Sequence, residues 1–160
     1  MVWITRDAED ERLDKARWRQ FLATRMPHRQ RTFFHVTERR NLPQIRAIGF
    51  LPSPKGDAGP GIYFYDNLEA AQEYPQLRPH DDPVILRLRS SLPVHSADQI
   101  RKVGWWDKDN VGDTYRLQHV WVYPTTVPWR PRRIDVADLC YDRSRRSFHG
   151  SAAGWTLLNR

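Results

Sequence analysis

The stretch GIYFYDNLEAAQEY, residues 61–74, places a short apolar strand directly before a short helix. Residues 62–65 form an uninterrupted run of β-branched and aromatic side chains, which is typical of a strand. Residues 67–74 then have the pattern of a short helix. Tyr63 and Tyr74 are therefore expected either to be core residues or to form the two walls of a slot for a flat ring.

The segments around this stretch predict a single domain of the α+β class, in which helices come early and strands later. Strands are predicted over residues 32–37, 62–65, 84–88, 115–123 and 134–141, and helices over 8–26, 42–48 and 67–74. Pro43 suits the first turn of the second helix and Gly49 its C-terminal cap, while Asp66 or Asn67 is expected to cap the third. We divide the chain into an N-terminal helical extension, residues 1–31, and one globular unit, residues 32–160.

Composition favours a partner that carries phosphate. The chain has 160 residues and a formal net charge of +7, and arginine supplies most of the excess. Arginine binds phosphate bidentately, although a basic surface that only maintains solubility gives the same composition. Cys140 is the single cysteine, so no internal disulfide can form, and its apolar surroundings predict burial. Because no long apolar run or signal peptide is seen, we expect a cytoplasmic protein without a membrane partner.

Two motifs together resemble a known family. The first is TFFHVT, residues 32–37, followed by a helix that ends in IGFLPS; the second is GIYFYD with a further tyrosine one helix later. In this order, with a glycine-rich loop between them, they resemble the ADP-ribosyltransferase superfamily, and most closely its poly(ADP-ribose) polymerase and diphtheria-toxin branch. The likeness covers roughly residues 32–136. It implies a split β-sheet core and NAD as co-substrate, with no metal ion.

The resemblance also implies roles for individual residues. His35 matches the family's histidine, which hydrogen-bonds a ribose hydroxyl of NAD. The backbone of Val36, with Thr37 beside it, matches the position that holds the nicotinamide amide. Tyr63 and Tyr74 match the two tyrosines that sandwich the nicotinamide ring. A flat, partly cationic ring gains from stacking on phenol faces.

Two further positions follow from the same resemblance. Lys55, in the loop 53–61, is expected near the NAD phosphates. The family has a catalytic glutamate shortly before a late strand, but here the sequence is YRLQHVWVY and either Gln118 or His119 occupies that place. Aligning VWVY favours His119. Neither side chain supplies a full negative charge, so the resemblance leaves room for a nearby acid: Asp107, Asp109 or Asp113.

The first hypothesis for function is therefore an NAD-dependent mono-ADP-ribosyltransferase. Its acceptor is expected to be nucleic acid or else protein, and polymer synthesis is not expected without the glutamate. Such an enzyme would fit a bacterial toxin or defence effector, for which an antitoxin or regulatory protein is a possible partner. One alternative is a non-catalytic module that binds NAD, ADP-ribose or a nucleic-acid end. Another is a basic nucleic-acid-binding domain with no NAD site.

Two other segments give weaker signals of a binding site. Trp129 with Arg130, Arg132 and Arg133 interleaves an aromatic residue with cations, which suits either nucleic-acid binding or packing at a sheet edge. The sequence His80-Asp81-Asp82 contains metal-ligand types, but no second cluster at matching spacing accompanies it, so no metal site is expected.

Overall fold

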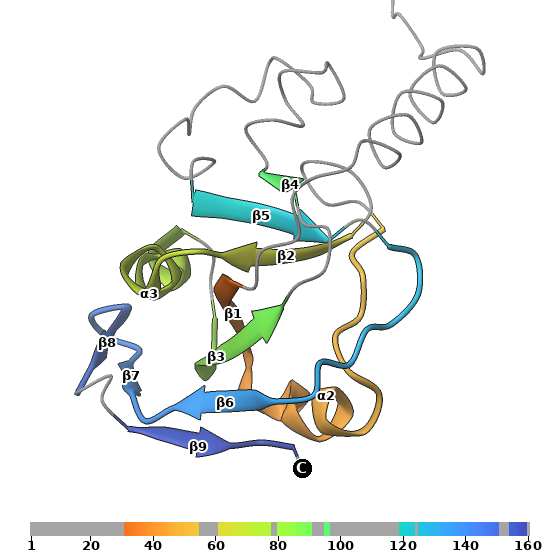
Figure 1. Cartoon of the computed structure of the whole chain (residues 1–160). Helices are drawn as coiled ribbons and strands as arrows, with labels where there is room; N and C mark the ends of the chain where they lie inside the picture. Colours follow the sequence, from red (N-terminus) through yellow and green to blue (C-terminus); the bar gives the residue numbers. More distant parts are fainter. Residues whose placement is uncertain are drawn as a thin grey trace, which may run out of the picture.

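The computed structural model describes residues 31–54, 61–77, 80–90, 95–96, 119–123, 125–150 and 154–159. Within these ranges the chain is a mixed α/β structure built on a mostly antiparallel sheet with two α-helices (Figure 1). The predicted helix over residues 8–26 lies outside them. No helix in the described ranges is long and apolar enough to cross a membrane.

The main sheet has seven strands within the described ranges, in the order β4-β5-β2-β1-β3-β6-β9. Each strand runs antiparallel to its neighbours in this sheet. Its strands are β1 (Arg31–Glu38), β2 (Ile62–Tyr65), β3 (Pro83–Ser90), β4 (His95–Ser96), β5 (Val120–Tyr123), β6 (Ile134–Ala137) and β9 (Trp155–Leu157). A separate hairpin pairs β7 (Cys140–Asp142) with β8 (Ser147–His149).

Two α-helices, α2 (Leu42–Ile48) and α3 (Leu68–Leu77), lie on opposite sides of the sheet (Figure 1). A short 3₁₀ turn, η1 (Arg39–Asn41), leads from β1 into α2. Successive side chains of a strand point to opposite faces, so each strand contributes to two cores. Phe33 packs in the cluster that contains Ile45 of α2, whereas Phe34 packs in the cluster that contains Ala71 of α3.

β1 pairs very differently with its two neighbours. It pairs with β3 over its whole length, from Arg31 opposite Ser90 to Glu38 opposite Pro83. With β2 the register has a single pair among the described residues, Phe34 opposite Tyr65. The ladder pairing between the two strands that carry the sequence motifs is therefore much shorter than that between β1 and β3.

The helix ends follow the expected local chemistry. Pro43 lies in the first turn of α2, and Gly49 caps it with a φ of 89°. A Cβ at Gly49 would collide with the carbonyl group of Trp129, so glycine is required there for a close backbone approach as well as for its φ. Asn67 caps α3, because its Oδ1 accepts the N–H of Glu69 at 2.8 Å and of Ala70 at 3.3 Å.

Three predictions need correction. The segment 134–141 was predicted as one strand, but β6 ends at Ala137 and β7 begins at Cys140. After β6 the N–H of Asp138 donates to the carbonyl of Gly154 at 2.8 Å, in register with the β6–β9 ladder, and β7 then pairs with β8 outside the main sheet. Cys140 is exposed, so the predicted burial is wrong. The helix predicted over residues 67–74 continues through Pro75 to the end of α3. Of the strand predicted over 115–123, the structure describes β5, and residues 111–118 lie outside the described ranges.

Candidate functional site

His35 follows Phe34, the β1 residue of the one described β1–β2 ladder pair, and its ring joins the two strands. Its Nδ1 is 2.8 Å from the backbone oxygen of Tyr63. A carbonyl oxygen can only accept a hydrogen bond, so Nδ1 must carry the proton and Nε2 is left as the acceptor nitrogen. This bond adds a link between β1 and β2 beside their short ladder pairing.

An aromatic cage surrounds the imidazole of His35. The ring meets Phe50 and Phe64 edge-on, with centroid distances of 4.8 and 5.8 Å. Burial lowers the pKa of His35 below its ordinary value of 6.5, and the hydrogen bond to the Tyr63 carbonyl opposes this lowering only in part. His35 is therefore a neutral imidazole near pH 7, with its tautomer fixed by the backbone.

The predicted tyrosines gather on the opposite face, the α3 side of the sheet. The ring of Tyr74 contacts the ring of Tyr65, with centroids 5.7 Å apart, and also contacts His80 at 5.3 Å. Strand alternation places Tyr63 on the same face as Tyr65. The ring placed directly against Tyr74 is that of Tyr65, and the slot between Tyr63 and Tyr74 stays a prediction. Tyr63 reaches His35 through its backbone, while the His35 ring lies on the α2 side with Phe64.

Val36 and Thr37 are held in the regular ladder between β1 and β3, opposite Ile85 and Val84. Val36 packs in the α3-side core. The hydroxyl of Thr37 accepts a hydrogen bond from Asn41 Nδ2 at 3.1 Å. Asn41 is the N-cap residue of α2, yet its side chain makes no cap hydrogen bond and stabilises the end of β1 instead.

His119 precedes β5 and pairs with a carboxylate that the sequence pointed to only as a helix cap. Nδ1 of His119 is 3.0 Å from Oδ1 of Asp66, and Nε1 of Trp121 donates to Oδ2 of Asp66 at 2.9 Å. The Asp66 N–H donates to the His119 carbonyl at 3.0 Å, so backbone and side chains lock the two residues together. Sequence analysis found no charged group at the place of the family's glutamate, and Asp66 brings one beside His119. The only signal for it was an aspartate directly after the GIYFY strand.

His35 and His119 lie on the same face, two strands apart. His35 packs on Phe64, and His119 pairs with Asp66 two residues further along β2. Ideal strand spacing and rise place their Cα atoms roughly 12 Å apart. The α2 side therefore carries one neutral imidazole and one imidazole supported by a carboxylate. The remaining predicted site residues, Lys55, Gln118, Asp107, Asp109 and Asp113, lie outside the described residues.

The aromatic and basic segment before β6 contains residues of both predicted kinds. Trp129 is a packing residue, stacked on Phe50 at 6.2 Å and tilted against Tyr123 at 5.5 Å. Arg130, Arg132 and Arg133 are exposed and line a groove. Among the described side chains, no group of three or more His, Cys, Asp or Glu residues is placed to hold a metal ion.

No protein-family model, curated protein or solved structure matches this chain.

Proposed function

We propose that this chain is an NAD-dependent mono-ADP-ribosyltransferase built on the split sheet of that superfamily. The observation that carries the proposal is the 2.8 Å hydrogen bond from Nδ1 of His35 to the backbone oxygen of Tyr63. It joins the two sequence motifs next to the one described ladder pair of β1 and β2. It also leaves Nε2 of a neutral imidazole to accept a hydrogen bond from a ribose hydroxyl.

The aromatic residues on β2 and α3 suit the nicotinamide end of NAD. Tyr63, Tyr65 and Tyr74 provide phenol faces on the α3 side of the sheet, the face opposite the His35 ring, and Tyr65 and Tyr74 are already in contact. The proposal therefore requires the nicotinamide riboside to pass from one face to the other where the β1–β2 ladder pairing ends. Stacking on such faces favours a flat, partly cationic ring. The backbone of Val36 and Thr37, next to His35 on β1, is assigned to the nicotinamide amide.

The reaction breaks the bond between the ribose carbon and the nicotinamide nitrogen, and the bonding electrons leave with nicotinamide. A nucleophile of the acceptor forms the new bond to that carbon and loses a proton. The products are the ADP-ribosylated acceptor, nicotinamide and a proton. We assign the proton to His119, and Asp66 supplies the negative charge that stabilises both the imidazolium and the cationic transition state. The arginine excess supports nucleic acid as the acceptor.

The test is the release of nicotinamide from NAD, followed by proton NMR with the full-length chain. We expect release when single-stranded RNA or DNA is added and little release with NAD alone. His35→Gln should lower the rate by about 100-fold, because the amide oxygen does not take the position of Nε2 and the reacting carbon is displaced. His149→Gln changes an exposed histidine of β8 and should leave the rate unchanged. Equal rates for the two variants would contradict the assignment of His35.

A non-catalytic module for NAD or ADP-ribose is the second candidate, and one observation favours it. The residues of β5, Val120–Tyr123, include no carboxylate, and both oxygens of Asp66 already accept hydrogen bonds. This alternative predicts broadened NAD signals that sharpen again in His35→Gln, with no nicotinamide released under any condition.

A further inference from the structure

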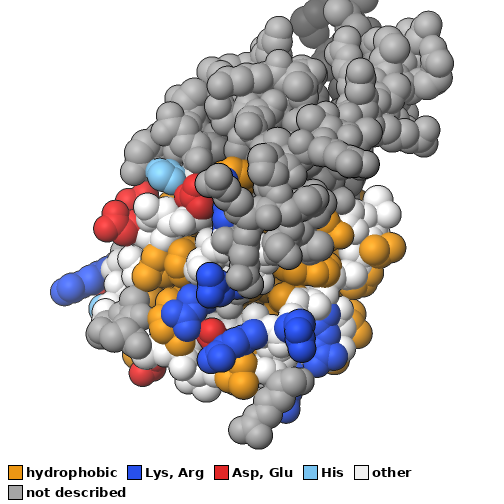
Figure 2. All heavy atoms as spheres, viewed as in Figure 1, with side chains coloured by type: hydrophobic (Ala, Val, Ile, Leu, Met, Phe, Trp, Pro, Cys, Tyr) orange, Lys and Arg blue, Asp and Glu red, His pale blue; other side chains and the backbone are white. Residues whose placement is uncertain are grey.

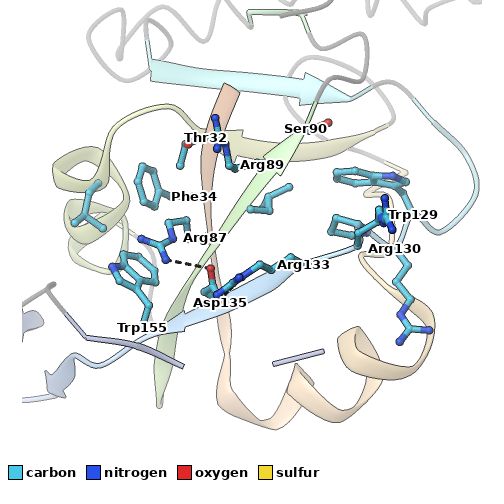
Figure 3. Close-up of a pocket in the computed structure, with 14 residues that line it drawn as sticks. Thr32, Phe34, Arg87, Arg89, Ser90, Trp129, Arg130, Arg133, Asp135 and Trp155 are labelled. Carbon is cyan, nitrogen blue, oxygen red and sulfur yellow. Dashed lines mark hydrogen bonds and ion pairs between the residues drawn. The ribbon is translucent and has the colours of Figure 1, made fainter. Parts of the chain in front are cut away.

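A groove of about 920 Å³ lies between β1, β3, β6 and β9 and the segment that precedes β6 (Figure 3). Its lining includes five arginines: Arg87, Arg89, Arg130, Arg132 and Arg133. Asp135 is the acidic residue in that lining. Figure 2 shows Lys and Arg side chains gathered on this face of the molecule among hydrophobic ones. The groove therefore has a large excess of positive charge.

Asp135 is fully engaged by two of the arginines. Its Oδ2 is 3.1 Å from Nη2 of Arg87, and its Oδ1 is 3.1 Å from Nε of Arg133. The Arg87 guanidinium also lies over the Trp155 ring, 4.2 Å from its centroid, and the Phe34 ring is 6.1 Å from Trp155. An arginine held by a carboxylate and an indole has little freedom left, so Arg87 and Trp155 form a preorganised stacking platform.

Arg89, Arg130 and Arg132 are exposed, and none has an acidic partner within the described ranges. The segment that carries Arg130 and Arg132 is fixed at both ends. Phe50 and Trp129 exchange backbone hydrogen bonds of 2.8 and 3.0 Å, and the buried Asn159 donates to the Pro131 carbonyl at 3.0 Å. These cations are thus held on an anchored segment beside the platform.

We propose that this groove binds a single-stranded nucleic acid, with phosphates on Arg89, Arg130 and Arg132 and a base on the Trp155–Arg87 platform. Planar guanidinium groups suit phosphate, and aromatic and guanidinium planes stack unpaired bases. The bases of a duplex are stacked on one another and cannot stack on the platform, and the acidic side chains of a peptide have no ring that could stack there. The volume is at the upper end for small-molecule sites, so it has room for more than one nucleotide.

The groove is a second binding site and does not rest on the proposed function, because it lies on the other face of the sheet from His35 and His119. Phe34 lines the groove on the α3 side of β1, whereas His35, the next residue, faces the α2 side. Binding in the groove needs neither His35 nor NAD.

The experiment measures fluorescence anisotropy of a labelled single-stranded 12-mer with the full chain, without NAD, over a salt series. The triple variant R89Q/R130Q/R132Q should weaken binding by about tenfold or more and reduce the slope of log K against log salt by about 2. The matched control R143Q/R145Q/R146Q removes the same charge from the β7–β8 turn and should bind within about twofold of wild type. Equal losses in the two variants would mean diffuse charge binding and overturn the proposal.

The platform is tested separately. Trp155→Leu should weaken binding about tenfold, and Trp155→Phe should restore most of it, because every base stacks on an aromatic face. Thermal unfolding shows whether each variant is folded, and the arginine variants test the groove even if Trp155→Leu is not. Equal binding of a 12-bp duplex, displacement of the strand by a mononucleotide at comparable concentration, or displacement by polyglutamate at equal charge would each overturn the single-strand assignment.

Because no NAD is present, the two proposals fail in different ways. If the groove variants lose strand binding, ADP-ribose transfer to a protein acceptor, with release of nicotinamide, should still occur. Strand binding without nicotinamide release would refute the transferase and leave the groove standing.

Discussion

His35 and His119 lie on one face of the same sheet, and each has an oxygen acceptor at Nδ1, but their surroundings differ. His35 bonds to a neutral backbone carbonyl inside a cage of Phe50 and Phe64. His119 bonds to the Asp66 carboxylate, where the two side chains are 26% and 32% exposed. The sheet fixes the tautomer in both cases. The packing around His35 lowers its pKa, whereas His119 differs from it in bonding to a carboxylate.

The surroundings of His35 stabilise this end of the sheet through the packing of aromatic rings. Phe50→Ala should lower the free energy of unfolding by about 3–5 kcal/mol, because Phe50 is buried and its loss leaves a cavity between His35, Phe64 and Trp129. Leu51→Ala is the matched control, since Leu51 is 53% exposed and should change stability by no more than about 0.5 kcal/mol. Urea denaturation of both variants measures the difference. A similar loss in the two would mean that the aromatic cage does not hold this end of the sheet.

Much of the structure around His35 could be predicted from local sequence. The runs of β-branched and aromatic residues that predicted β1, β2 and β3 are local signals, and so are Pro43 and Gly49 around α2. The side of β1 that His35 faces was not predictable, because it depends on the register with β2 and on Phe50, which arrives after α2. The split of 134–141 into β6 and β7 likewise depends on pairing partners elsewhere in the chain, because β6 pairs with β3 and β9 whereas β7 pairs with β8.

The contacts of His119 were less predictable from the sequence than those of His35. Asp66 and His119 are 53 residues apart, and they meet because β2 pairs with β5 in one particular register, with Tyr65 opposite Val120. A shift of that register by one residue would turn His119 to the other face. The family resemblance made His119 a candidate, with Gln118 as the alternative, but it did not point to Asp66 as the partner of His119.

The proposed role of His119 depends on the negative charge of Asp66. Asp66→Asn keeps a carbonyl acceptor but removes the negative charge, and nicotinamide release should fall about tenfold or more, since a general base contributes at least that much. His119→Gln should lower the rate of nicotinamide release by at least as much. The double variant should be no slower than His119→Gln alone, because the two residues act as one unit.

The matched control for this charge change is Glu69→Gln. Glu69 is exposed in the first turn of α3, three residues from Asp66, and its loss should leave the rate unchanged. If Asp66→Asn behaves like Glu69→Gln, then Asp66 serves only to orient His119 and Trp121, and the comparison between the two histidines reduces to packing.

The smallest expected effect is the pH dependence of stability, which sharpens the comparison at His35. Burial lowers the pKa of His35 below 6.5, so above that pH both the folded and unfolded chains hold the ring neutral. As the pH falls below 6.5, the unfolded chain takes up a proton that the folded chain does not. The free energy of unfolding therefore decreases, by at most about 1.4 kcal/mol per pH unit, until the folded pKa is reached. Urea denaturation at pH 7.5 and 5.5 should show wild type losing stability relative to His35→Gln, with His149→Gln following wild type. If His35→Gln instead follows wild type, the caged ring accepts a proton as readily as an exposed one, and the two histidines differ only in their hydrogen-bond partners.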